Sequence, residues 1–225
     1  MTFSLIARCS RTGMFGAAVS SSSISVASRC GSWARAGVGV AATQNVTDPR
    51  LALVGLDLLA RGCGAPFALE QMVAAGRFPE YRQLGLVDGD GAVAHHTGAK
   101  ALGRHGAATG PGCLALGNLL RSGAVPQRMV DAFVAAPSEH LAERLVRALE
   151  AGLAAGGEEG PVRSAGLYVV DRQAWPAVDL RVDWHDKPIE ALRELWTLYK
   201  PQMADYVTRA LNPAAAPSYA VPGNP

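Results

Sequence analysis

The order in which strand-like and helix-like segments follow one another constrains the fold of this chain more than any other feature. Strand character opens the chain, helical spacing dominates its middle, strand character returns at residues 164–183, and a final helical stretch follows. Single strands do not alternate with single helices, as they do in folds built on one parallel sheet. We therefore expect an α+β protein in which two stacked antiparallel or mixed sheets lie between helical layers.

Three strands are expected within the first 44 residues. Residues 2–9 and 14–21 have strand-like patterns separated by Arg11-Thr12-Gly13, which has the composition of a turn, so they should form a hairpin. Residues 37–44 (GVGVAATQ) carry small and β-branched side chains. That composition suits a central strand covered on both faces.

The middle of the chain should contain two helices and a second hairpin. The first helix begins after Asp48-Pro49 and ends at Gly62, and the second covers residues 66–75. A hairpin is expected from residues 83–87 and 92–96, because Asp88-Gly89-Asp90-Gly91 between them tolerates positive φ. Residues 97–117 are rich in Gly and Ala with little periodicity, which predicts a loop that forms a wall of the site.

The remaining segments complete one domain. Residues 127–136 and 138–156 predict two helices in one covering layer, the second with Ser138 as its N-cap and Gly156-Gly157 as its stop. Two strands and two last helices are expected at residues 164–170, 177–183, 188–199 and 201–211. Residues 1–211 are thus predicted to form a single domain, and the Pro- and Ala-rich residues 212–225 a disordered or loosely attached tail.

Charge and cysteine content exclude several classes of function. The 225 residues include 21 basic and 19 acidic side chains without long runs of one sign, so nucleic acid is not an expected partner. The four cysteines form no CxxC pair and have no histidine at zinc-site spacing, so we expect reduced, mostly buried thiols, no metal and no cofactor. The chain shows neither a signal peptide nor an apolar run long enough for a membrane span, which predicts a cytoplasmic protein with no membrane partner.

Thr2 is the candidate nucleophile. A hydroxyl needs a nearby base to become nucleophilic, and a residue at the chain start has its own α-amine, with a pKa of about 7.7 to 8.0, for this task. Small second residues such as Thr2 permit removal of Met1, and the strand predicted after Thr2 would hold it in place. Many proteins begin with Met-Thr, however, so the position alone does not establish this role.

Motifs along nearly the whole chain resemble a known family. They are MTFSLIAR, WARAGVGVAATQN, GLDLLARG, YRQLGLVD, TG at Thr97-Gly98, GNLL, LAERLVRALEAGLAAGG, SAGLYVV and VDLRVDWH. Together they resemble the bacterial family catalogued as domain of unknown function 1028, which is placed among the N-terminal nucleophile (Ntn) hydrolases. The resemblance implies a four-layer αββα fold whose first strand opens at the nucleophile. At Glu158-Glu159-Gly160-Pro161 the chain departs from the acidic-arginine-glycine turn expected there.

Two further residues are candidates for catalysis. Arg35 would either lie beside Thr2, where its charge favours a neutral amine, or form a surface ion pair. Asn118 offers an amide donor for an oxyanion, although Gly-Asn is also common in turns.

The candidates for substrate binding come from three places. Thr43 and Gln44 end a predicted buried strand, and Thr97 begins the predicted loop. Asp179, Arg181 and Asp183 share one strand face, and they would grip a polar substrate group or form an ion network. Candidate residues with a weaker case are the three histidines near Thr97 and the serine run 20–23, for which surface positions and a flexible turn are the favoured interpretations.

These observations lead to one main hypothesis. Thr2 attacks a small amide, cyclic amide or peptide, its α-amine carries the proton, and donors including Asn118 hold the oxyanion. No cofactor is required, and a homo-oligomer is compatible with the sequence. The alternatives are a hydrolase that uses Ser20 or Cys9, and a non-catalytic ligand-binding or scaffold protein on the same fold.

Overall fold

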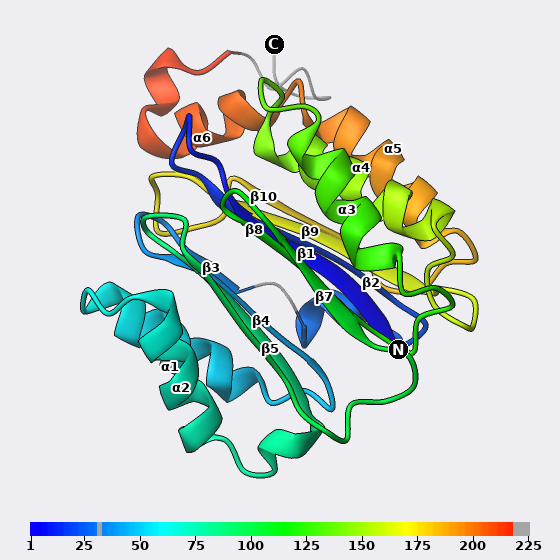
Figure 1. The fold of residues 1–225 in the computed structure, drawn as a ribbon. Coiled ribbons are helices and arrows are strands. Elements are labelled where there is room, and N and C mark those ends of the chain that lie inside the picture. Colours follow the sequence, from blue (N-terminus) through cyan, green and yellow to red (C-terminus); the bar gives the residue numbers. More distant parts are fainter. Residues whose placement is uncertain (31–32, 218–225) are drawn as a thin grey trace.

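The chain folds into a mixed α+β structure with two antiparallel sheets. The computed structural model describes residues 1–30 and 33–217. Within these residues, one sheet has the strand order β10-β9-β2-β1-β8-β7 and the other the order β3-β4-β5-β6 (Figure 1). Their strands are β1 (Thr2–Arg8), β2 (Phe15–Ser21), β3 (Trp33–Arg35), β4 (Gly39–Asn45), β5 (Arg82–Asp88), β6 (Val93–Thr97), β7 (Gly106–Gly110), β8 (Cys113–Asn118), β9 (Ser164–Val170) and β10 (Val178–Val182).

Helices cover the outer face of each sheet. In Figure 1, α1 and α2 lie against the four-stranded sheet, and α3, α4 and α5 lie against the six-stranded one. The helices are α1 (Pro49–Ala60), α2 (Ala65–Ala75), α3 (Val125–Val134), α4 (Leu141–Ala154), α5 (Pro188–Tyr199) and α6 (Met203–Leu211). Short 3-10 turns lie at Val26–Ser28, Pro79–Tyr81 and Pro213–Ala215. The predicted segments for α1, α2 and α5 are confirmed to within one or two residues.

The two sheets pack face to face through a core of their own. Ile6 and Phe15 of the first sheet share this core with Val40 and Val87 of the second. The close approach depends on a glycine in β5, because a Cβ on Gly85 would lie 2.5 Å from a Leu114 side-chain carbon. Burial on both faces explains why the strand at 39–45 has the small-residue composition noted in the sequence.

The predicted loop at residues 97–117 is wrong. This segment contains the adjacent strands β7 and β8, and β8 pairs with β1 along its length. β8 is buried on both faces and β7 is made of Gly, Ala and Thr, so neither strand shows an alternation of apolar and polar residues. Their place beside the first strand was therefore hidden in the sequence pattern.

The N-cap of α4 also differs from the prediction. His140 rather than Ser138 precedes the helix, and its Nδ1 accepts a hydrogen bond from the Ala142 backbone N–H. The predicted apolar stripe is correct, since Leu141, Leu145 and Leu149 are all buried.

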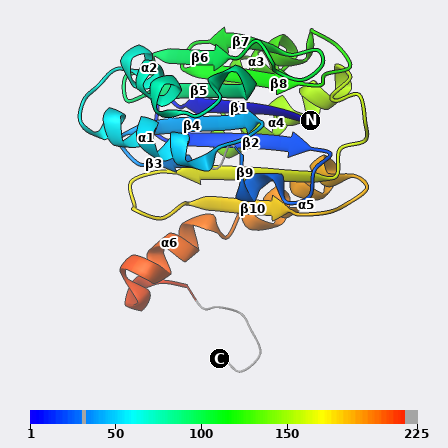
Figure 2. The same cartoon turned by 90° about the horizontal axis from the view of Figure 1, so that it is seen from below.

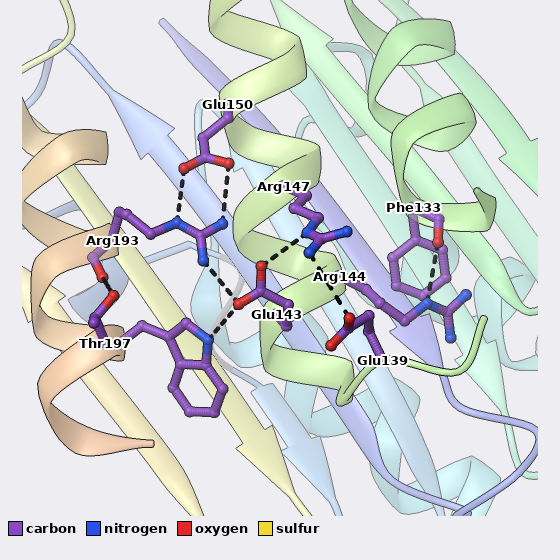
Figure 3. A network of polar contacts seen from close by, with 9 residues as sticks. Phe133, Glu139, Glu143, Arg144, Arg147, Glu150, Arg193 and Thr197 are labelled. Atoms are coloured by element: carbon purple, nitrogen blue, oxygen red, sulfur yellow. Dashed lines mark hydrogen bonds and ion pairs between the residues drawn. The ribbon is translucent and has the colours of Figure 1, made fainter. Parts of the chain in front are cut away.

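A charged network joins α4 to α5 (Figure 3). The Glu143 carboxylate accepts hydrogen bonds from the guanidinium groups of Arg147 and Arg193, and from the Trp196 indole N–H, at 2.8 to 2.9 Å. Arg193 also forms a two-pronged ion pair with Glu150. The network therefore holds α5 against the helix that covers the first sheet.

The C-terminal helix α6 contacts the rest of the fold only partly, through Met203 against the core and Tyr206 stacked on Tyr199. Figure 2 shows α6 projecting from the edge of the sheets, and none of its residues is buried. The turn Pro213–Ala215 follows it and buries no residue either. Residues 218–225 of the predicted disordered tail lie outside the described residues, so that prediction and the single-domain boundary stay predictions.

Candidate active site

Thr2 is the first residue of the central strand β1. Its side chain is almost completely buried, and its neighbours across the sheet are Asn118 on β8 and, by extension of the β1–β2 register, Ser21 on β2. Directly opposed residues of antiparallel strands project on the same face. Thr2, Asn118 and Ser21 therefore share one face at one end of the six-stranded sheet.

This face points toward the second sheet. Phe3 and Leu5 belong to the core beneath the helices, whereas Ile6 belongs to the core between the sheets. Because side chains alternate along a strand, Thr2 and Ser4 lie on the Ile6 face. The Ser4 hydroxyl confirms this orientation, since it donates a 2.6 Å hydrogen bond to Oε1 of Gln44 on β4.

A buried chain of amide side chains connects the sheets next to Thr2. Gln83 on β5 is its centre: Oε1 accepts hydrogen bonds from Gln44 Nε2 at 2.7 Å and from Asn118 Nδ2 at 3.2 Å. Its own Nε2 donates to the carbonyls of Gly117 and Gly106 and to the Thr97 hydroxyl. Gln83, Gln44 and Asn118 are each at most 1% exposed, so these hydrogen bonds replace lost contacts with water.

The network determines which way each amide points. Gln83 must direct Nε2 at the two backbone carbonyls, so its Oε1 faces Gln44 and Asn118, and both of these must offer their NH₂ groups. Asn118 is therefore left with a buried Oδ1 that has no hydrogen-bond partner. An unpaired buried acceptor on the residue opposite Thr2 is suited to receive a hydrogen bond from an amine.

The carbonyl of the peptide bond between Met1 and Thr2 lies among hydroxyl groups. The Thr2 hydroxyl donates to the Met1 carbonyl oxygen at 2.5 Å, and the Ser21 hydroxyl donates to the same oxygen. Ser20 and Ser21 are the buried last residues of β2, so the interpretation of this serine run as a flexible turn is wrong for these two residues. Ser21 belongs to the site, which agrees with the alternative interpretation of residues 20–23 as candidate site residues.

Glu158 is a site residue that no local sequence pattern indicates. Gly156 and Gly157 adopt φ values of 122° and 57° after α4, which lets the chain reverse and pair Glu158 with Leu120, two residues beyond Asn118. The carboxylate is 2% exposed, and it accepts hydrogen bonds from the Ser22 backbone N–H at 3.1 and 3.2 Å. Burial raises the pKa of Glu158 to about 7, although the positive charge of the Met1 amine and the hydrogen bonds from Ser22 lower it.

A cavity of about 490 Å³ opens beside Glu158. Its lining is largely apolar and also contains the charged side chains of Arg121, Asp186, Lys187 and Glu190. The other lining residues are Leu153, Gly156, Gly160, Pro161 and Val162. Met1 borders this wall, because a Cβ built on Gly160 would lie 3.4 Å from Met1 Cε. The site thus combines a hydroxyl, an unpaired amide oxygen, a buried carboxyl group and adjoining space.

Arg35 does not lie beside Thr2. It belongs to the edge strand β3 and pairs with Gly39 at the start of β4, whereas Gln44, which is linked to Ser4, lies near the other end of that strand. The Arg35 guanidinium forms a 3.0 Å ion pair with Asp57 on the exposed face of α1. The expected catalytic position is therefore wrong, and the alternative of a surface ion pair is correct.

The predicted substrate contacts are divided between the site and other places. Gln44 and Thr97 join the amide network, but the Thr43 hydroxyl is bonded to that of Thr47 at 2.7 Å, away from Thr2. β10 is the edge strand, separated from β1 by β9 and β2. There Arg181 pairs with Asp179 in an exposed contact at 3.0 Å, and Asp183 is exposed as well. The structure therefore does not bring these three charged residues to Thr2.

The histidines and cysteines considered in the sequence do not take part in this site. His96 contacts the Pro79 carbonyl and His105 the Gly103 carbonyl, and the described residues contain no group of three or more His, Cys, Asp or Glu able to hold a metal. Cys9, Cys30 and Cys113 are buried free thiols, and Cys63 is half-buried. In the described part of the chain, no helix combines the length and apolar character needed to cross a bilayer.

Comparisons with known proteins identify relatives of this architecture. The family model described as "Family of unknown function (DUF1028)" matches residues 2–192. The crystal structure of protein SPO2555 from Silicibacter pomeroyi, assigned to the same family model, is similar with a TM-score of 0.83 and 30% sequence identity. The similarity covers 91% of this chain and 89% of that one. No curated protein matches the chain.

Proposed function

Since this chain belongs to the DUF1028 family of unknown function, its activity has to be inferred from the site, and we propose that it is an Ntn hydrolase. It would cleave a small amide, cyclic amide or peptide bond with Thr2 as nucleophile once Met1 is removed. One observation carries this proposal: the Thr2 hydroxyl contacts the carbonyl of the preceding peptide bond, and the Ser21 hydroxyl polarises the same oxygen. The Met1 carbonyl marks the position of a substrate carbonyl.

The proposed fold type is the four-layer αββα sandwich of these hydrolases. Its support is the face-to-face packing of the two sheets, each with helices on its outer face. The nucleophile at the start of a central strand agrees with this arrangement, because both neighbouring strands restrain it.

The base in this mechanism is the α-amine of Thr2. Among the described residues, no histidine, lysine or carboxylate forms a hydrogen bond with the Thr2 hydroxyl. The neutral amine takes the hydroxyl proton as Oγ1 attacks the substrate carbonyl, and the resulting ammonium gives that proton to the leaving nitrogen as the C–N bond breaks. Water then hydrolyses the Thr2 ester by the same proton path and frees the hydroxyl.

Neighbouring groups have different roles in this proposal. The Ser21 hydroxyl is the donor for the developing oxyanion, because it already donates to the carbonyl oxygen in front of Thr2. Asn118 suits a different role from the predicted oxyanion donor, since its NH₂ group donates to Gln83 and its buried Oδ1 has no hydrogen-bond partner. We assign that oxygen to holding the Thr2 amine.

The alternative nucleophiles have less support. The Ser20 hydroxyl is fully buried and donates to the Ser164 carbonyl, and Cys9 lies just beyond the opposite end of β1 from Thr2. A non-catalytic ligand-binding protein would use the same cavity, but it gives no reason for two hydroxyls to converge on one carbonyl. The proposed chemistry requires no cofactor, and the cytoplasmic location and a homo-oligomer stay predictions.

The decisive experiment starts from protein whose N-terminus is defined. A ubiquitin fusion cleaved by its specific protease exposes Thr2 directly, and intact mass verifies the absence of Met1. Thr2→Ala should reduce hydrolysis of a panel of amides at least 10³-fold, about 4 kcal/mol in activation free energy, because it removes the nucleophile.

The matched control is Thr2→Ser, which keeps a hydroxyl and an α-amine at the same position and should retain measurable hydrolysis. Circular dichroism would verify that all three proteins are folded. Undiminished hydrolysis by Thr2→Ala, or full activity in protein that retains Met1, would overturn the assignment of Thr2.

A further inference from the structure

Met1 occupies the place of an acyl group in front of the proposed nucleophile. Its carbonyl oxygen accepts hydrogen bonds from Thr2 and Ser21, and its amide bond to Thr2 stands where a substrate amide would be attacked. The surroundings of the rest of Met1 therefore indicate which acyl groups the site accepts.

The side-chain end of Met1 lies against a glycine. A Cβ on Gly160 would be 3.4 Å from Met1 Cε and 3.8 Å from Sδ, which are ordinary van der Waals distances, so the end of the Met1 side chain reaches position 160 and the glycine leaves room beside it. Leu153, Pro161 and Val162 continue the apolar lining of the cavity beyond it. This lining favours an apolar substrate side chain over a charged one.

The amine end of Met1 lies near the Glu158 carboxylate, which lines this cavity. Glu158 is 2% exposed and forms no ion pair with any residue in the described part of the chain, and its hydrogen bonds come from the Ser22 backbone. The positive charge of the Met1 amine is close enough to lower the Glu158 pKa against the effect of burial. A buried carboxylate without a cationic side chain is stabilised by a cationic ligand.

We propose that the site binds an α-aminoacyl group: Glu158 holds the free ammonium, Ser21 the carbonyl oxygen, and the space over Gly160 an unbranched apolar side chain. This inference rests on the proposed function and names its substrate class. The enzyme would release the N-terminal residue from an aminoacyl amide or short peptide, and an N-acylated substrate would be a poor one.

Binding tests this class separately from catalysis. Calorimetry on the chain beginning at Thr2 would compare L-methioninamide with N-acetyl-L-methioninamide at pH 8, where Glu158 is ionised and an appreciable part of the free amine is protonated. The free amine should bind at least tenfold more tightly. Glu158→Gln should abolish this difference, and Glu159→Gln, which removes the same charge from the exposed neighbouring residue, should preserve it.

A second variant tests the side-chain space. Gly160→Val should weaken binding of L-methioninamide at least tenfold while it leaves binding of L-alaninamide within about twofold, because only the longer side chain reaches Gly160. A general loss of folding would weaken both ligands equally, so the ratio of the two affinities is the readout.

The outcomes separate the two proposals. Equal affinity for the free and acetylated amides, no binding of either, or an unchanged preference in Glu158→Gln would overturn the aminoacyl site. If the free amides bind as expected but no amide is hydrolysed, the proposed hydrolase function fails while the binding site stands.

Discussion

Glu143 and Glu158 are both nearly buried glutamates, yet their surroundings differ in one respect. Glu143 receives hydrogen bonds from Arg147, Arg193 and Trp196 (Figure 3), whereas Glu158 receives them from the Ser22 backbone. Burial would raise the pKa of Glu143, but hydrogen bonds from Arg193, Arg147 and Trp196 outweigh it and lower that pKa to about 2. Burial dominates at Glu158 and raises its pKa to about 7.

The comparison separates a structural carboxylate from one available for binding. At Glu143 the cations come from the fold itself, so ionisation stabilises the contact between α4 and α5. At Glu158 the hydrogen-bond donors are backbone groups, and no cationic side chain among the described residues forms an ion pair with it. The ionised carboxylate therefore costs free energy until a cationic ligand binds beside it. Similar burial therefore does not indicate a similar role.

The largest effect on stability is expected from replacing Glu143, the carboxylate whose hydrogen-bond and charge partners are supplied by the fold. Glu143→Ala should lower the free energy of unfolding by about 3 to 5 kcal/mol, because it leaves the half-buried Arg193 with only Glu150 as its ion-pair partner and removes the acceptor of the buried Trp196 N–H. Urea denaturation measures this change. Glu194→Ala, at an exposed position on α5, should cost less than 1 kcal/mol, and equal losses in the two variants would contradict the assigned role of Glu143.

A smaller effect of opposite sign is expected at Glu158. A folded-state pKa of about 7 lies above the unfolded value of 4.5, so the protonated carboxyl stabilises the fold fully below pH 4.5, and this contribution is lost as the pH rises through 7. Glu158→Gln keeps an uncharged acceptor and should therefore raise the free energy of unfolding by about 1 to 3 kcal/mol at pH 8, with little change at pH 5.

Denaturation at both pH values, with Glu159→Gln as the control, measures this difference. The Glu143 contribution has the reverse dependence, since it is present above pH 4.5 and lost as the pH falls toward 2. Destabilisation by Glu158→Gln at pH 8 would show that the fold does supply Glu158 with a cation.

The smallest effect is expected where a charge pair is open to solvent. Arg35 and Asp57 side chains are 43% and 58% exposed, and such pairs contribute little to stability. Arg35→Ala should change the free energy of unfolding by less than about 0.5 kcal/mol and leave amide hydrolysis unchanged. A tenfold loss of hydrolysis in a normally folded Arg35→Ala variant would contradict the surface role and indicate that Arg35 contributes to the site.

Local patterns predicted the elements that have one distinct face or a strong turn. The first hairpin, the hairpin around Asp88-Gly89-Asp90-Gly91, and α1, α2 and α5 follow from alternation, turn residues and helical spacing. β7 and β8 escaped prediction because a strand buried on both faces, or made of Gly and Ala, lacks a period. The resemblance to the DUF1028 family was confirmed, since that family model matches residues 2–192, whereas the placement among the Ntn hydrolases stays a proposal.

The site residues likewise include some that the sequence indicated and some that it did not. Thr2, Asn118, Gln44 and Thr97 were selected from sequence and lie in or beside one network. Arg35 and the charged face of β10 were selected on residue type, which does not report distance, and they lie elsewhere. Gln83 and Glu158 were not selected, because nothing local distinguishes a glutamine in a strand or a glutamate after two glycines from exposed residues.

The sequence by itself determined the order of most elements, the family, and the chemical possibility of a nucleophile at Thr2, because these depend on neighbouring residues and on motifs. Only the tertiary structure decided which polar groups meet. Residues 2, 21, 83, 118 and 158 come together through pairing between distant strands and a reversal after α4. Burial and missing charge partners then set the chemistry of Glu158, and both are properties of the packed chain rather than of any segment.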